Sequence, residues 1–101
     1  MHVFLFSGVR AYIQTLPPAE QSVIRHQIEV LRSREHAGIH TKQLKGPLRE
    51  LIVRDHRISY FLIADIIYFV RGFRKKTQKT PPAEIEYAEK AYKAIQEMIG
   101  I

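Results

Sequence analysis

The 101-residue chain contains no cysteine, no tryptophan and no long hydrophobic run. The lack of cysteine excludes disulfides, thiolate catalysis and cysteine-ligated metal sites. No apolar stretch reaches the roughly 20 residues that a membrane-spanning helix needs. The N-terminal segment also lacks the basic and long apolar regions of a secretory signal peptide. We therefore expect a soluble, cytoplasmic protein that makes no contact with a membrane.

Acidic residues are also scarce relative to basic ones. Sixteen Lys and Arg stand against ten Asp and Glu, which gives a formal net charge of +6. Such a surplus on a small domain is typical of proteins that bind nucleic acid or an acidic protein partner. The basic residues concentrate between Lys42 and Lys79, where the acids are Glu50, Asp55 and Asp65. We expect the functional surface in this segment.

The residues that are present suffice for one hydrophobic core, since 46% of them are hydrophobic and five are Tyr and five Phe. A single domain over residues 1–101 is therefore expected. The aromatic-rich run at 2–7 favours a strand. Helical spacing begins after Gly8, Pro17-Pro18 separates two helical segments, and Gly38 is a stop signal for the second. These two segments predict a helical hairpin.

The second half of the chain predicts a sheet followed by a helix. Residues 39–47 lack periodicity and contain Gly46-Pro47, so a surface loop is expected. Dense β-branched and aromatic runs with short connections then predict a three-stranded antiparallel meander, at residues 48–54, 57–64 and 66–71. One buried helix over 57–70 is the alternative interpretation.

After the basic stretch 72–80, Thr80 is placed to cap a helix that opens with Pro81. The order of elements predicts an α+β fold of two layers, with an N-terminal strand, a helical hairpin, the meander and a C-terminal helix.

Conventional catalytic and metal-binding groupings are missing from the pattern. The serines do not lie in a nucleophile-elbow context. His36 and His40 have the spacing of a helical metal-binding pair, but Gly38 between them breaks the helix that would align them. We expect no metal site and no cofactor.

The remaining candidates for chemistry are basic residues around the expected sheet. RNA can be cleaved by such a set without metal, because the 2′-hydroxyl beside the scissile phosphate is the nucleophile and cations stabilise the charge that develops. Arg57 is favoured because it begins an otherwise apolar strand, and His56, Tyr60 or a lysine are candidates for proton transfer. The other basic members are Lys45, Arg49, Arg54, Arg71, Arg74, Lys75, Lys76 and Lys79. A solvated basic surface is the alternative interpretation.

Three ordered motifs carry a family resemblance. Leu44-Lys45-Gly46 is followed by Glu50-Leu51, then by the run RISYF from Arg57, and finally by GFRKKTQKTP from Gly72 to Pro81. Together they resemble the RelE/ParE toxin superfamily, most closely its HigB-like, phage-derived branch. In the pattern of that branch, Trp, Arg and His are usual at the positions occupied here by Arg49, Ile52 and Arg71.

The resemblance implies a RelE-like fold and the toxin of a type II toxin–antitoxin system, a metal-independent, ribosome-dependent endoribonuclease that cleaves mRNA and inhibits translation. The implied partners are mRNA, the ribosome and a cognate antitoxin, commonly a helix-turn-helix protein. Arg57 would contact the scissile phosphate, and Arg71, Lys75 and Lys76 would line the catalytic cleft. RNA binding is expected of Lys45, Arg49, Arg54, Arg74 and Lys79. A ParE-like inhibitor of DNA gyrase and a non-catalytic nucleic-acid-binding module remain the alternatives.

Overall fold

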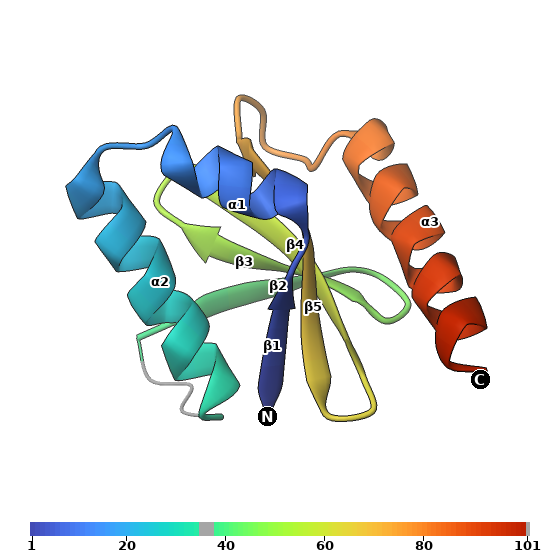
Figure 1. Cartoon of the computed structure of the whole chain (residues 1–101). Coiled ribbons are helices and arrows are strands. Elements are labelled where there is room, and N and C mark those ends of the chain that lie inside the picture. Colours follow the sequence, from blue (N-terminus) through green and yellow to red (C-terminus); the bar gives the residue numbers. More distant parts are fainter. Residues whose placement is uncertain (35–37, 101) are drawn as a thin grey trace.

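The computed structural model describes residues 1–34 and 38–100, which form a five-stranded mixed sheet and three helices (Figure 1). The elements in chain order are β1 (His2–Leu5), α1 (Ser7–Gln14), α2 (Pro18–Arg32), β2 (His40–Lys45), β3 (Leu48–Val53), β4 (His56–Ile63), β5 (Ile66–Arg74) and α3 (Pro82–Ile99). The α+β class, the helical hairpin, the meander and the C-terminal helix are confirmed. Within the described residues, no helix is both long and apolar enough to cross a membrane.

The sheet has the strand order β1-β5-β4-β3-β2. Strands β2 to β5 are antiparallel, whereas β1 pairs in parallel with β5, so that His2 lies opposite Ile66. Because β4 is a continuous strand between β3 and β5, the alternative of a helix over 57–70 is wrong.

The expected loop over 39–47 is wrong for most of its length, because β2 pairs with β3 from His40 to Lys45. This edge strand has exposed or half-buried side chains and no apolar alternation, so its backbone hydrogen bonds rather than its side chains define it. Gly46, with a φ of +54°, and Pro47 form the turn. Strand β5 likewise continues to Arg74, which lies opposite His56.

Helices cover both faces of the sheet. Alternate residues of each strand point to opposite sides, so each face carries its own apolar side chains for a helix to pack against. On one face, α1 and α2 pack their buried residues Val9, Ile13 and Ile24 against a cluster that includes Ile58 and Phe69. On the other face, α3 packs against strand residues including Phe61 and Val70. Its contact positions Ala88 and Ala91 are small, which lets this helix approach the sheet closely.

Two helix boundaries differ from those predicted. Helix α2 ends at Arg32 instead of continuing to Gly38, and Arg34 has a φ of +63° that is incompatible with a continued helix. The expected cap of α3 is also wrong. Pro81 is the N-cap and provides no side-chain cap, while the Thr80 hydroxyl donates to the Glu50 carboxylate. His36 lies outside the described residues, so its expected lack of a metal role is not addressed by the structure.

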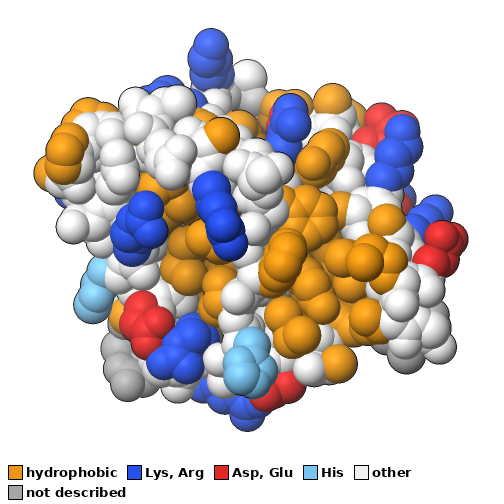
Figure 2. Space-filling view, viewed as in Figure 1, with side chains coloured by type: hydrophobic (Ala, Val, Ile, Leu, Met, Phe, Trp, Pro, Cys, Tyr) orange, Lys and Arg blue, Asp and Glu red, His pale blue; other side chains and the backbone are white. Residues whose placement is uncertain are grey.

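Hydrophobic side chains also gather on the surface shown in Figure 2. Phe4 of edge strand β1 is 50% exposed and contacts Phe6 and Tyr68, and Met98 and Ile99 are exposed near the end of α3. Exposed apolar residues of this extent on a small domain are typical of surfaces that contact other proteins.

Gly72 is a position where packing requires glycine. A Cβ atom there would lie 2.8 Å from Cδ2 of Tyr12, whose hydroxyl is fixed by a hydrogen bond to Nδ1 of His56. We expect Gly72→Ala to lower the free energy of unfolding by about 1–3 kcal/mol, because the ring must move to admit the methyl group. Urea denaturation measures this loss. Gly8→Ala is the control, because nothing lies within 4 Å of its Cβ position; equal stability of both variants would contradict the packing explanation.

Candidate nucleic-acid interface

Three basic side chains surround one hollow of about 430 Å³, which we call the cationic hollow; its lining is Arg57, Lys75, Lys76, Thr77 and Gln78. Arg57 is the second residue of β4 and lies on the sheet face that carries α3, since Phe61 on the same alternation packs against that helix. It pairs with Phe73, near the end of β5, and the chain then leaves the sheet as the basic loop, residues 75–79. The loop therefore runs beside Arg57.

The guanidinium of Arg57 is held by backbone carbonyl groups at the β3–β4 turn. Its Nη1 donates to the carbonyl oxygens of Arg54 and His56, at 2.6 Å and 2.9 Å. Its Nε is buried and has no hydrogen-bond partner among residues 1–34 and 38–100. Because Nη1 is held by two carbonyls and Nε is buried, Nη2 is the nitrogen left to donate to the oxygens of a phosphate group.

Asp55 anchors the beginning of the basic loop. Its carbonyl oxygen accepts a hydrogen bond from the backbone N–H of Lys75 at 2.7 Å, and its carboxylate pairs with Arg74 at 2.5 Å. The hydrogen bond from Arg74 holds the pKa of Asp55 below its usual value. Arg74 is therefore engaged with the β3–β4 turn and is not among the residues that line the hollow.

The Asp55–Arg74 pair gives a pH-dependent contribution to stability. Because the folded-state pKa of Asp55 is lowered, the contribution is present above the unfolded-state value and is lost as the pH falls through the folded-state value. We expect wild type to lose more stability than Asp55→Asn between about pH 4 and about pH 2, although the effect is small for exposed groups. Urea midpoints across this range provide the measurement. Glu86→Gln, on the exposed side of α3, should follow wild type; an Asp55→Asn profile parallel to wild type would refute the assignment.

Arg71 lies on the same sheet face but is engaged with α3. Its guanidinium donates to both carboxylate oxygens of Glu84, at 2.8 Å and 3.3 Å, and lies 4.8 Å from the centre of the Tyr87 ring. The hydrogen bond to Glu84 raises the pKa of Arg71. Its charge is therefore largely compensated, and it is not part of the lining of the hollow.

His56 and Tyr60 point away from the hollow, to the face that carries α1 and α2. His56 is completely buried, with Nδ1 2.5 Å from Tyr12 Oη and Nε2 2.8 Å from Glu20 Oε1. Burial raises the pKa of Tyr12. Tyr60 is 6% exposed and packs against Phe69. The structure thus separates both expected proton-transfer groups from Arg57, because odd and even positions of β4 face opposite sides of the sheet.

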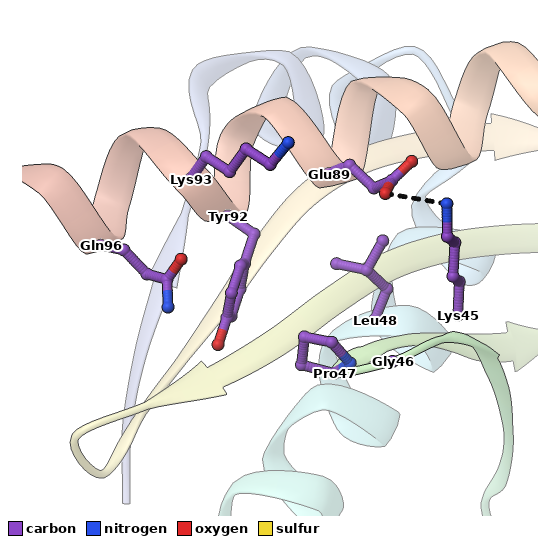
Figure 3. A pocket seen from close by; sticks show the side chains of 8 residues that line it. All are labelled: Lys45, Gly46, Pro47, Leu48, Glu89, Tyr92, Lys93 and Gln96. Carbon is purple, nitrogen blue, oxygen red and sulfur yellow. Dashed lines mark ion pairs between the residues drawn. The ribbon is translucent and has the colours of Figure 1, made fainter. Parts of the chain in front are cut away.

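The other expected RNA-binding residues are dispersed. Arg49 donates to Thr41 Oγ1 at 2.9 Å and to Tyr60 Oη at 3.4 Å on the face of α1 and α2. Arg54 lies in the β3–β4 turn with a φ of +57°, and Lys79 is exposed at the end of the basic loop. Lys45 pairs with Glu89 at 3.1 Å beside a 210 Å³ pocket between α3 and the β2–β3 turn (Figure 3). Lys45 therefore connects the turn to α3.

Two features of this region were not predicted. Thr77 and Gln78 line the hollow, and their position inside the motif GFRKKTQKTP was the available signal. Glu20, Asp55 and His56 also place one potential metal-ligand atom each within 4.8 Å of one another. Both ring nitrogens of His56 are hydrogen-bonded, and Asp55 is paired with Arg74, so this grouping forms a polar network that links α1 and α2 to the sheet.

The fold defined above is that of RelE toxins. An archaeal RelE–RelB complex from Pyrococcus horikoshii OT3 has a TM-score of 0.64 at 17% identity, covering 72% of this chain and 92% of that one. A RelB–RelE antitoxin–toxin complex from Methanococcus jannaschii has a TM-score of 0.60 at 17% identity, covering 70% of this chain and 88% of that one. A copper-bound mutant toxin from Helicobacter pylori has a TM-score of 0.56 at 21% identity, covering 73% of this chain and 93% of that one.

The family is assigned by sequence. The model of the phage-derived Gp49-like protein family matches residues 11–93, and the chain belongs to that family. The RelE superfamily relationship predicted from the three motifs is thereby confirmed. No curated protein sequence matches the chain.

Proposed function

We propose that this protein is the toxin of a toxin–antitoxin system and that its cationic hollow binds the phosphate backbone of RNA. The convergence of Arg57, Lys75 and Lys76 around one hollow is the observation that supports this proposal most directly. Arg57 is already oriented by two carbonyl groups, so little conformational freedom is lost when its free donors bind a phosphate.

The arrangement suits cleavage of RNA by its own 2′-hydroxyl. This oxygen attacks the adjacent phosphorus, the bond from phosphorus to the 5′-oxygen breaks, and the products are a 2′,3′-cyclic phosphate and a 5′-hydroxyl. The 2′-hydroxyl loses a proton and the 5′-oxygen gains one. In this scheme Arg57 stabilises the negative charge on the phosphorane oxygens, while Lys75 and Lys76 hold the neighbouring phosphates.

The proposed partners follow from charge and from the named structural neighbours. The neighbours from Pyrococcus and Methanococcus are complexes of RelE with RelB, so we propose a cognate antitoxin for this chain. The resemblance to the HigB-like branch leads us to propose a helix-turn-helix antitoxin. The net charge of +6 favours an antitoxin that is acidic where it covers the hollow. The proposed substrate is mRNA that is being translated on the ribosome.

Mapping of RNA 5′ ends after induction tests this function. The chain is expressed in a bacterium from a tightly repressed promoter, and RNA is collected within minutes of induction. New 5′ ends inside translated reading frames, missing when translation is blocked beforehand, are the expected result. Growth arrest without new ends would overturn the nuclease proposal and favour a toxin that acts by binding, such as a gyrase inhibitor.

A further inference from the structure

One buried hydrogen bond joins two motifs that are far apart in the sequence. Glu50 belongs to the motif that begins at Leu44, and Thr80 belongs to the basic motif that begins at Gly72. The Thr80 hydroxyl donates to Oε1 of Glu50 at 2.9 Å. Glu50 is completely buried and Thr80 is 7% exposed, so water competes little for this bond. The two motifs therefore form a single structural unit.

Glu50 lies on the same side of the sheet as the cationic hollow. It is opposite Ser59 in the β3–β4 ladder, and Arg57 is the next residue of β4 on that face. Diagonal neighbours of this kind are within reach of long side chains. Glu50 and Arg57 are therefore diagonal neighbours on the sheet face of the proposed RNA-binding group.

A stability role alone explains Glu50 poorly. Its Oε2 is buried and has no hydrogen-bond partner in the described part of the chain. Burial of a carboxylate with incomplete hydrogen bonding costs free energy, and an apolar side chain of similar size fills such a position at lower cost. The bond to Thr80 is what an apolar residue at position 50 would be unable to supply.

The effect of that bond is to anchor the second end of the basic loop. The first end is held by the hydrogen bond from Lys75 N–H to the Asp55 carbonyl. After the loop, Thr80 is buried while residues 76–79 are exposed. With Thr80 released, the loop would be held at Lys75 alone until α3 begins at Pro82.

We propose that Glu50 is a positioning residue that, through Thr80, holds the basic loop so that Lys75 and Lys76 remain beside Arg57 at the hollow. Glu50 itself makes no contact with RNA. The consequence for cleavage rests on the function proposed above, whereas the anchoring of the loop does not.

Two substitutions test the proposal from the two ends of the bond. Thr80→Val removes the donor and keeps the branched shape, and Glu50→Leu removes the acceptor. Amide hydrogen exchange of Lys75, whose N–H is bonded to the Asp55 carbonyl, and trypsin cleavage after Lys75, Lys76 and Lys79 are measured on the full chain. We expect both to become about tenfold faster in each variant, with little further increase in the double variant, while amides of β4 and β5 exchange as in wild type.

The matched variants are Thr80→Ser, which retains the hydroxyl and should restore slow exchange, and Thr15→Val. Thr15 donates only to the Tyr12 carbonyl at the end of α1, so its loss should leave the loop unchanged. For cleavage of RNA we expect kcat to fall about tenfold in Thr80→Val and Glu50→Leu, even where Glu50→Leu unfolds at an equal or higher urea concentration.

Wild-type exchange of the loop in both variants would overturn the proposal, as would faster exchange together with unchanged kcat. If the wild-type protein cleaves no mRNA on translating ribosomes, the proposed function fails, and faster loop exchange still supports the anchoring by Glu50.

Discussion

Arg57→Ala is expected to reduce RNA cleavage by at least about 100-fold, equivalent to a loss of roughly 3 kcal/mol of transition-state stabilisation. The side chain is the only guanidinium that lines the cationic hollow within residues 1–34 and 38–100. It is also oriented before substrate binds, so no other described group can replace its donors without rearrangement. Single-turnover cleavage of mRNA on translating ribosomes, together with growth after induction, measures the effect.

The control for Arg57 is Arg25→Ala, which removes an equal charge from the exposed surface of α2. It should cleave RNA as wild type does. Because Arg57 also binds the carbonyls of Arg54 and His56, the stability of Arg57→Ala is measured in parallel, and a loss of at most about 1–2 kcal/mol is expected. A folded Arg57→Ala protein that still arrests growth would remove Arg57 from the mechanism.

His56→Ala is expected to lower the free energy of unfolding by about 3 kcal/mol. The substitution empties a completely buried position and deprives Tyr12 and Glu20 of their hydrogen-bond partner. This is a large part of the 5–15 kcal/mol that holds a typical domain folded. Urea denaturation at 25 °C, at a pH near 7, is the measurement.

The same variant separates structural from catalytic roles. Since His56 lies on the opposite sheet face from Arg57, His56→Ala should retain cleavage activity per folded molecule at low temperature. Tyr12→Phe, which removes only the hydroxyl, should lose about 1 kcal/mol and keep full activity. Loss of cleavage by a His56→Ala protein shown to be folded would restore histidine as a catalytic candidate.

Much of the fold was predictable because its elements have strong local signals. The helical hairpin, the meander and the last helix each follow from apolar periodicity and from Pro and Gly at their ends. Strand β2 was missed because its side chains are largely exposed and its pairing with β3 depends on backbone groups, which all residues share. The cap predicted at Thr80 was wrong because a buried acceptor from another strand, Glu50, takes its hydroxyl.

The basic residues of the candidate site were predictable from the sequence, whereas the side of the sheet on which each candidate lies was not fully used. Arg57, Lys75 and Lys76 converge, as the family resemblance implied. His56 and Tyr60 were expected to be candidates for proton transfer beside Arg57, although positions one or three apart along a strand face opposite sides. That rule was available from the sequence. The pairing of Arg71 with Glu84 and of Lys45 with Glu89 was not, because it depends on where α3 crosses the sheet.

The parallel pairing of β1 with β5 has a consequence for the order of folding. His2 pairs with Ile66, so the first strand finds its neighbour only after the chain has closed a loop of more than 60 residues. Contacts of such separation form slowly, and among the residues that the structure describes β1 has no other strand beside it in the sheet. During folding, β1 remains unpaired until β5 has formed. Until β5 has formed, β1 is therefore open to pairing with strands of other chains, which favours aggregation.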